Sequence, residues 1–71
     1  MNIAFERDKA EIKKNSGNGI VILRGRKAEI AAVEKRLRET RNAFVAQCCQ
    51  QQLEKLRNEY RILNDMIRFT L

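Results

Sequence analysis

Histidine is missing from the sequence, and the only two cysteines, Cys48 and Cys49, are neighbours. Without an imidazole there is no base for Ser-His-Asp or Cys-His catalysis. Adjacent cysteines exclude almost every zinc-site pattern, because such sites need ligands that are separated along the chain. Acidic residues stand at ordinary helix salt-bridge spacings from arginines, as Glu34 does from Arg38 and Asp65 from Arg68, so no carboxylate pair is set apart as an acid and a base. We therefore expect a protein that is not an enzyme and that holds neither a metal nor another cofactor.

Proline is also missing, and the three glycines (Gly17, Gly19 and Gly25) all lie in the first third of the chain. Residues that break regular structure are thus confined to this third. No apolar run reaches the roughly 18 residues of a membrane-spanning helix, and the N-terminus lacks the apolar core of a signal peptide. We expect no membrane partner and an intracellular location, cytoplasmic or, in a eukaryote, nuclear, where both thiols stay reduced.

The first third of the chain carries two segments that favour strands. Residues 2–6 alternate polar and apolar side chains, and residues 19–24 contain a mostly β-branched apolar run. The polar segment between them ends in Asn18-Gly19, which suits a tight hairpin turn. The sequence therefore predicts a β-hairpin in residues 1–25 and a helical region in residues 26–71, which together form one small α+β domain.

The region from Arg26 to Leu71 contains no Gly or Pro and is rich in good helix formers. One helix of this length is unusual, so the region is either one very long helix or two consecutive helices. Two apolar stripes with helical spacing run through it: Ile30, Val33, Leu37 and Phe44, and then Leu53, Leu56, Tyr60, Leu63 and Ile67. Their phases differ by two residues, so one straight seam cannot serve both. Thr40-Arg41-Asn42 is the best candidate for a turn, because Thr and Asn can cap a helix start.

The second stripe predicts a surface for a partner. A chain of 71 residues has little core, and small scaffolds without disulfides or metals are commonly supported by association. We expect a homodimer through this stripe, or docking on a larger protein; in the alternative, the stripe packs on the first helix of its own chain. Cys49 lies on the same seam, either as a small buried residue, which we favour, or near its counterpart in a parallel dimer. The partner-binding residues of this hypothesis are Leu53, Leu56, Tyr60, Leu63 and Ile67.

The formal net charge of +6 favours anionic partners, nucleic acid first. A well-solvated surface is the alternative explanation, because such a charge is common on soluble domains. Residues 1–27 hold seven basic and three acidic residues, so most of the excess lies in the predicted hairpin and at its corner with the helix. The second functional hypothesis is therefore RNA or DNA binding through phosphate contacts. Its candidate residues are Lys13, Lys14, Arg24, Arg26 and Lys27.

The order of these segments also bears a family resemblance. A predicted strand at residues 3–8, a polar loop, a predicted strand at residues 19–25 and a helix with apolar Ile30, Val33 and Leu37 follow one another. This pattern resembles the C-terminal half of a type I KH domain of the vigilin sort, which implies a strand–strand–helix fold. That family binds RNA through a GXXG loop between two earlier helices, and this sequence has no GXXG. The resemblance therefore assigns no RNA-contact residue and favours protein contact at least as much as RNA contact.

Overall fold

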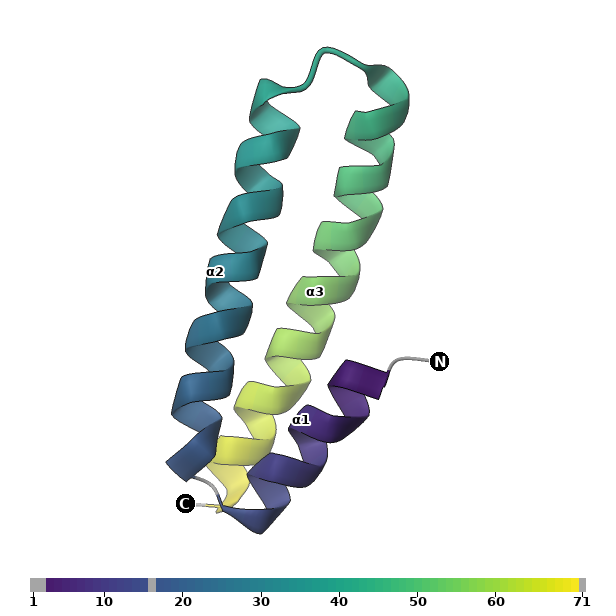
Figure 1. Cartoon of the computed structure of the whole chain (residues 1–71). Helices are drawn as coiled ribbons and strands as arrows, with labels where there is room; N and C mark the ends of the chain where they lie inside the picture. Colours follow the sequence, from purple (N-terminus) through teal and green to yellow (C-terminus); the bar gives the residue numbers. More distant parts are fainter. Residues whose placement is uncertain (1–2, 16, 71) are drawn as a thin grey trace.

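A computed structural model describes residues 3–15 and 17–70, with the side chain of Thr70 excepted. These residues form three α-helices: α1 (Ile3–Lys14), α2 (Gly17–Glu39) and α3 (Ala43–Thr70). The two long helices run antiparallel as a helical hairpin, and α1 packs against the end of the hairpin that lies away from its turn (Figure 1). We call this end, where α2 begins and α3 finishes, the open end.

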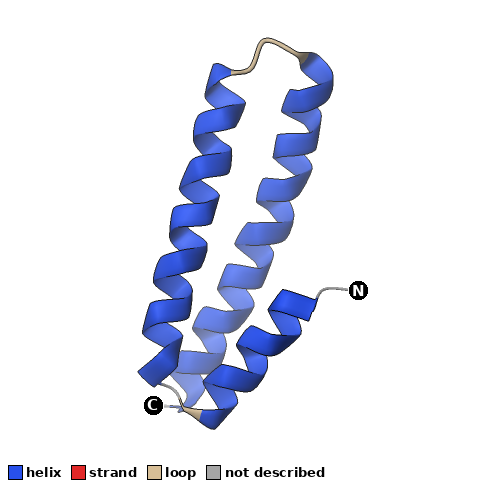
Figure 2. Cartoon of the chain, in the orientation of Figure 1, coloured by secondary structure: helices blue, strands red, loops and turns tan. Residues whose placement is uncertain are grey.

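The predicted β-hairpin is wrong, because the described part of residues 1–25 contains helix and no strand (Figure 2). Ile3–Glu6 of the first predicted strand belong to α1, while Asn2 lies outside the described residues. Residues 19–24, the second predicted strand, lie in the first turns of α2. The preference of β-branched residues for strands spans only about 1 kcal/mol, and packing against a neighbouring element can override it. Here Ile22 packs against the core between α1 and α3, and the helical backbone makes that contact possible.

The turn expected at Asn18-Gly19 lies three residues earlier in the chain. Asn15 ends α1, and its side-chain Oδ1 accepts a hydrogen bond from the Gly17 amide at 2.9 Å. The Asn18 amide donates to the Asn15 carbonyl at 3.0 Å, so Asn15 caps the start of α2. Ser16 lies outside the described residues. Because α2 follows at once, the described residues do not form the strand–strand–helix fold that the KH resemblance implies.

The predicted turn at Thr40-Arg41-Asn42 is confirmed, and with it the alternative of two helices rather than one. Asn42 caps α3: its Oδ1 accepts hydrogen bonds from the amides of Phe44 at 2.9 Å and Val45 at 3.2 Å. The predicted start of the helical region at Arg26 is wrong, because α2 already begins at Gly17. Leu71, the predicted end of that region, lies outside the described residues.

The core consists of two apolar clusters along the hairpin. Near the turn, Val33 of α2 packs with Cys49, Leu53 and Leu56 of α3. Near the open end, Ile12 of α1 packs with Leu63 and Ile67 of α3, and Ile12 and Leu63 are almost completely buried. Only this second cluster involves α1, so the half of the hairpin near the turn is a two-helix structure.

Gly19 allows α2 and α3 to approach closely at the open end. A Cβ atom at this position would lie 2.6 Å from Cγ1 of Ile67 and still closer to its Cδ1. Ile67 is itself buried in the core, so its side chain has little room to move aside. Gly25, by contrast, has nothing within 4 Å of an added Cβ. Neither glycine has a positive φ, so the two positions differ in packing and not in backbone conformation.

A buried ion-pair network joins all three helices at one point. Arg26 of α2 donates from Nε to Asp8 of α1 and from Nη1 to Glu59 of α3, both at 2.8 Å. Its guanidinium also lies 5.7 Å from the ring centroid of Phe5 in α1. Burial lowers the pKa of Arg26, but the hydrogen bonds to Glu59 and Asp8 outweigh this effect and raise the pKa above its usual value. Arg26 is therefore a permanent cation inside the fold.

The two glycines give a matched pair of substitutions. Gly25→Ala should stabilise the protein by about 1 kcal/mol, the usual gain in helix propensity. Gly19→Ala should destabilise it by about 1 kcal/mol, because overpacking against Ile67 outweighs the same gain. Urea denaturation followed by circular dichroism measures both free energies of unfolding. Equal effects at the two positions would show that the close approach of α2 to Ile67 is not present in solution.

Removing the buried cation should cost more than any single surface substitution. Arg26→Leu leaves the Glu59 carboxylate buried without the guanidinium, a loss of about 3–5 kcal/mol that can unfold so small a domain. The double variant Arg26→Leu/Glu59→Leu removes both charges and should recover most of the helical signal and of the free energy of unfolding. If the single variant matched the wild type in urea denaturation, the network would have no structural role.

Candidate functional site

The residues predicted to bind a partner are largely buried within their own chain. Leu53, Leu56, Leu63 and Ile67 keep between 0% and 7% of their surface exposed, and Tyr60 is half-buried. The residues of α1 and α2 cover them, as in the alternative of packing inside one chain. Dimerisation through this stripe stays a prediction, and it would require the chain to exchange these internal contacts for contacts with a second copy.

The five residues predicted to contact phosphates do not form one surface. Arg26 is buried between two carboxylates and cannot contact a partner from there. Lys13 and Lys14 are exposed in the last turn of α1. Arg24 and Lys27 are exposed on α2, on a side of this helix that does not pack on α1. The four exposed residues therefore belong to two separate regions, Lys13 and Lys14 at the end of α1 and Arg24 and Lys27 on α2.

This surface is the face of the α2–α3 hairpin that lies away from α1. The groove between α1 and α2 is lined on α2 by Val21, Ile22, Gly25, Arg26 and Glu29. A different set of α2 residues borders the opposite groove, in which α2 meets α3 directly. Along its length that groove is lined by Lys27, Ile30, Ala31, Glu34, Leu37 and Arg38 of α2 and by Gln50, Leu53, Glu54, Arg57 and Tyr60 of α3.

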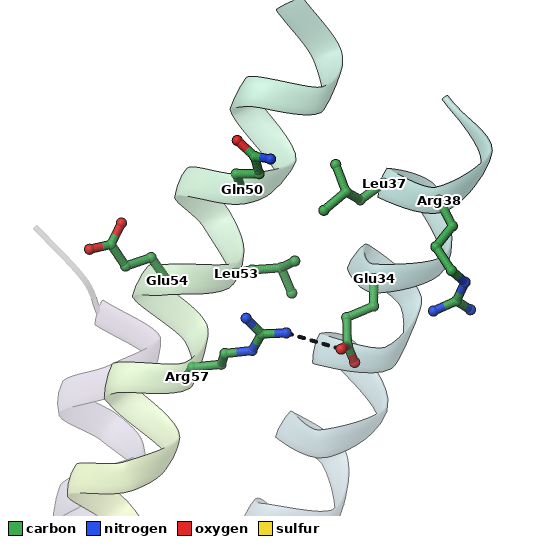
Figure 3. Close-up of a pocket in the computed structure, with 7 residues that line it drawn as sticks. All are labelled: Glu34, Leu37, Arg38, Gln50, Leu53, Glu54 and Arg57. Carbon is green, nitrogen blue, oxygen red and sulfur yellow. Dashed lines mark hydrogen bonds and ion pairs between the residues drawn. The ribbon is translucent and has the colours of Figure 1, made fainter. Parts of the chain in front are cut away.

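The half of this groove near the turn is electrically balanced. Arg57 of α3 reaches across it and donates from Nη2 to Oε2 of Glu34 at 3.0 Å (Figure 3). Arg38 and Glu54 stand on its two borders, one on each helix. Two basic and two acidic residues therefore share this half, which carries no net charge.

The half near the open end is basic. On α2, Arg24 precedes Lys27 by three residues and Ala31 by seven, so it lies on the same row as these groove residues. On α3, the row that begins at Arg57 continues at helical spacing through Arg61, Asn64 and Arg68. Lys27 and Tyr60 line one cavity, and Gly19 contacts Ile67, so these parts of the two rows lie side by side. We call Arg24, Lys27, Arg61 and Arg68 the basic cluster.

The side chains of the basic cluster are available to a ligand. All four residues are exposed, and none of them forms a salt bridge with any residue of the described ranges 3–15 and 17–70. Arg61 donates one hydrogen bond to the side chain of Asn58 at 2.9 Å, and this amide carries no charge. Glu34 and Glu54 are the acidic residues that line this groove; Glu34 also borders the cavity of Lys27, and it is paired with Arg57. Asp65 lies four residues after Arg61 and three before Arg68, but it forms no salt bridge with either and lines the groove that contains Lys13.

The basic cluster carries four of the six net positive charges of the chain. The rest of the sequence holds eleven basic and nine acidic residues, a net charge of only +2. Arg24 and Lys27 were among the predicted phosphate contacts, whereas Arg61 and Arg68 were not. The helical spacing from Arg57 indicates that Arg61 and Arg68 lie on one row of α3. Only the antiparallel packing of α3 on α2 places this row on the same face as Arg24 and Lys27. A strand at residues 19–24, as predicted from the sequence, is incompatible with that arrangement.

Other kinds of site have less support among the described residues. No group of three or more His, Cys, Asp or Glu residues in that part of the chain lies close enough together to hold a metal ion. None of its helices is long and apolar enough to cross a membrane. No known protein family, characterised protein or solved structure matches the chain.

The packing of the partner-binding stripe can be tested with the adjacent cysteines, because both are free thiols. Cys48 is exposed, while Cys49 packs with Val33, Leu53 and Leu56. A thiol reagent such as DTNB should modify one thiol per chain rapidly and the second only at the rate at which the helices separate. The variants Cys48→Ser and Cys49→Ser assign the two phases. Two equally fast thiols in the native protein would contradict the burial of this stripe within the chain.

Proposed function

We propose that this protein is a nucleic-acid-binding module whose contact surface is the basic cluster on α2 and α3. The observation that carries the proposal is the concentration of charge: four exposed cations that form no salt bridge with a described residue lie on one face of two helices that pack on each other. Lysine and arginine in such an arrangement gain affinity for phosphates by releasing the counterions that surround a nucleic acid. The proposal differs in its residues from the sequence hypothesis, because Arg26 takes no part.

The contacts expected here are with the phosphate backbone and not with base edges. The cluster stands on the outer rows of two paired helices, whose groove floor is formed by half-buried and buried residues such as Ile30, Tyr60 and Leu53. Arginine and lysine contacts to phosphates fix position and affinity but carry no sequence information. The protein should therefore bind nucleic acids of different sequence with similar affinity.

The surface proposed to bind nucleic acid differs from the stripe predicted to form a homodimer. The residues of the partner-binding stripe point into the chain, whereas the basic cluster points out of it. A surface with four uncompensated positive charges repels a second copy of itself, so self-association through this face is disfavoured. An anionic partner meets no such repulsion, and a nucleic acid brings the highest density of negative charge.

Two variants that remove the same number of charges test the proposal. Arg24→Gln/Lys27→Gln/Arg61→Gln/Arg68→Gln should lower the affinity for a nucleic acid by about 100-fold or more in 50 mM salt, since about four phosphate contacts are lost. The control Lys13→Gln/Lys14→Gln/Arg36→Gln/Arg41→Gln removes four exposed cations from other faces and should lower it less than about fivefold. Fluorescence anisotropy measures both affinities, and circular dichroism verifies that both variants are folded.

Salt dependence provides an independent measurement on the wild-type protein. Four phosphate contacts predict that log K falls with log salt with a slope of about −3.6, which is a loss of roughly 100-fold between 50 and 200 mM salt. Equal losses in the two quadruple variants would show that net charge and not the basic cluster governs binding. No binding of any nucleic acid at 50 mM salt would refute the proposal.

A further inference from the structure

We infer that the basic cluster is built for a double-stranded nucleic acid and that each of its two rows contacts one strand. This inference rests on the proposed function and names the ligand class of the same site. It depends on three features of the described structure: the division of the cluster between two helices, the rigidity of the rows and the placement of the aromatic residues.

The cluster consists of two pairs and not of one line. Arg24 and Lys27 stand on α2, and Arg61 and Arg68 stand on α3. Packed helices have axes about 8–10 Å apart, and side chains on their outer rows lie at least as far apart as the axes. This separation is of the order of the groove widths of a duplex, about 6 Å for the minor and about 12 Å for the major groove of B-DNA. Two backbones that border one groove therefore match two rows, whereas a single backbone would leave one row unused.

The rows cannot move together to enclose a single strand. Gly19 brings α2 into contact with Ile67, and the buried pair between Arg26 and Glu59 ties the same helices a few turns further along. Arg24 lies between these two contacts on α2 and Lys27 directly follows the second, so the spacing of the rows is set by the core. A fixed spacing suits a ligand that is itself stiff, which a duplex is and a single strand is not.

Aromatic residues do not support the binding of unpaired bases at this face. Proteins that bind single strands combine basic residues with exposed aromatic rings, and each stacked base contributes about 1–3 kcal/mol. Two of the four aromatic rings are strongly exposed, but Phe44 lies at the turn of the hairpin, and Phe69 borders the groove that contains Lys13 of α1. Tyr60 is half-buried in the α2–α3 groove, and Phe5 belongs to α1. Tyr60 is therefore the one ring beside the basic cluster, and its burial leaves little of it for a base to stack on.

Because one half-buried ring contributes little stacking, the density of phosphates decides between the two kinds of ligand. A duplex carries one negative charge for about 1.7 Å of its axis, while a single strand at the same rise carries half as many. Counterion release is also larger for the duplex, with about 0.9 ions per contact against about 0.7. Both terms favour the duplex, and the half-buried Tyr60 offsets them by no more than one stacked base. The preference should hold for duplex DNA and duplex RNA alike, because the cluster contacts phosphates only.

The experiment compares a labelled 20-base-pair duplex with each of its single strands, chosen to lack secondary structure, by fluorescence anisotropy in 50–300 mM salt. We expect the duplex to bind at least fivefold more tightly at 100 mM salt, with a slope of about −3.6. The row variants Arg24→Gln/Lys27→Gln and Arg61→Gln/Arg68→Gln should each reduce the magnitude of the duplex slope by about two. Circular dichroism verifies the fold of each variant.

The outcomes separate the inference from the proposed function. Single strands that bind as tightly as the duplex, or one row variant that accounts for the whole loss, would overturn the duplex assignment and leave nucleic-acid binding intact. Poly-glutamate of the same charge that competes as well as the duplex would overturn nucleic-acid binding itself, since an acidic protein would then be as good a ligand. Failure of both strands and duplex to bind at 50 mM salt would have the same consequence.

Discussion

Arg26 is the residue on which the arrangement of the three helices depends. It is a buried cation on α2 that meets a carboxylate from each of the other helices, Asp8 on α1 and Glu59 on α3, at 2.8 Å. Removing charges from water is costly, and only good geometry with paired partners compensates for it. A helix that slid by one turn would carry its carboxylate about 5.4 Å away and leave the charge unpaired. The network thus selects one register for α1 against the hairpin, a selection that the apolar contacts of Ile12 with Leu63 and Ile67 reinforce.

The position of α1 decides which face of the hairpin stays open. Because Asp8 pairs with Arg26 and Ile12 packs on α3, α1 covers the side of the two long helices that carries Ile22, Gly25 and Glu29. The opposite side, with Lys27 and Arg57, has no covering element among the described residues. The ion pairs of Arg26 with Asp8 and Glu59 thus hold α1 on one face of the hairpin and leave the basic cluster exposed on the other.

Features that depend on neighbouring residues, such as helix caps and apolar spacing, were predicted from the sequence. Features that depend on which helices pack together were not. The turn at Thr40-Arg41-Asn42 followed from capping residues and a change of hydrophobic phase, and both are local signals. The spacing of Leu53, Leu56, Leu63 and Ile67 correctly indicated a buried face of a helix. The spacing did not indicate which elements bury these residues, because α1 and the start of α2 were predicted to be strands.

The error at Ile20, Val21 and Ile22 has a physical cause of the same kind. β-branched residues favour strands only weakly, and in α2 only Ile22 of the three is drawn into the core, while Ile20 and Val21 stay 62% and 71% exposed. The burial of Ile22, of Gly19 against Ile67 and of Arg26 outweighs that preference, and each contact is made with a distant part of the chain. Charge counted along the sequence failed for a similar reason. It selected Lys13, Lys14 and Arg26, and it missed Arg61 and Arg68, which only the antiparallel pairing brings beside Arg24 and Lys27.

The uneven charge of the α2–α3 groove is itself an argument for function. In the half near the turn, Glu34 and Glu54 balance Arg38 and Arg57 on the same rows that continue toward the open end. In the other half the corresponding row positions are Ala31 and Asn64, and the four cations form no salt bridge with any described residue, although Asp65 stands beside Arg61 and Arg68 on α3. The helical scaffold tolerates glutamate on these rows, as Glu34 and Glu54 demonstrate, so its absence is not a requirement of the fold. Local features that reduce stability without a structural reason are typical of functional sites. The two halves of the groove thus differ in net charge on the same scaffold. The half with excess positive charge is the half that a phosphate backbone would stabilise.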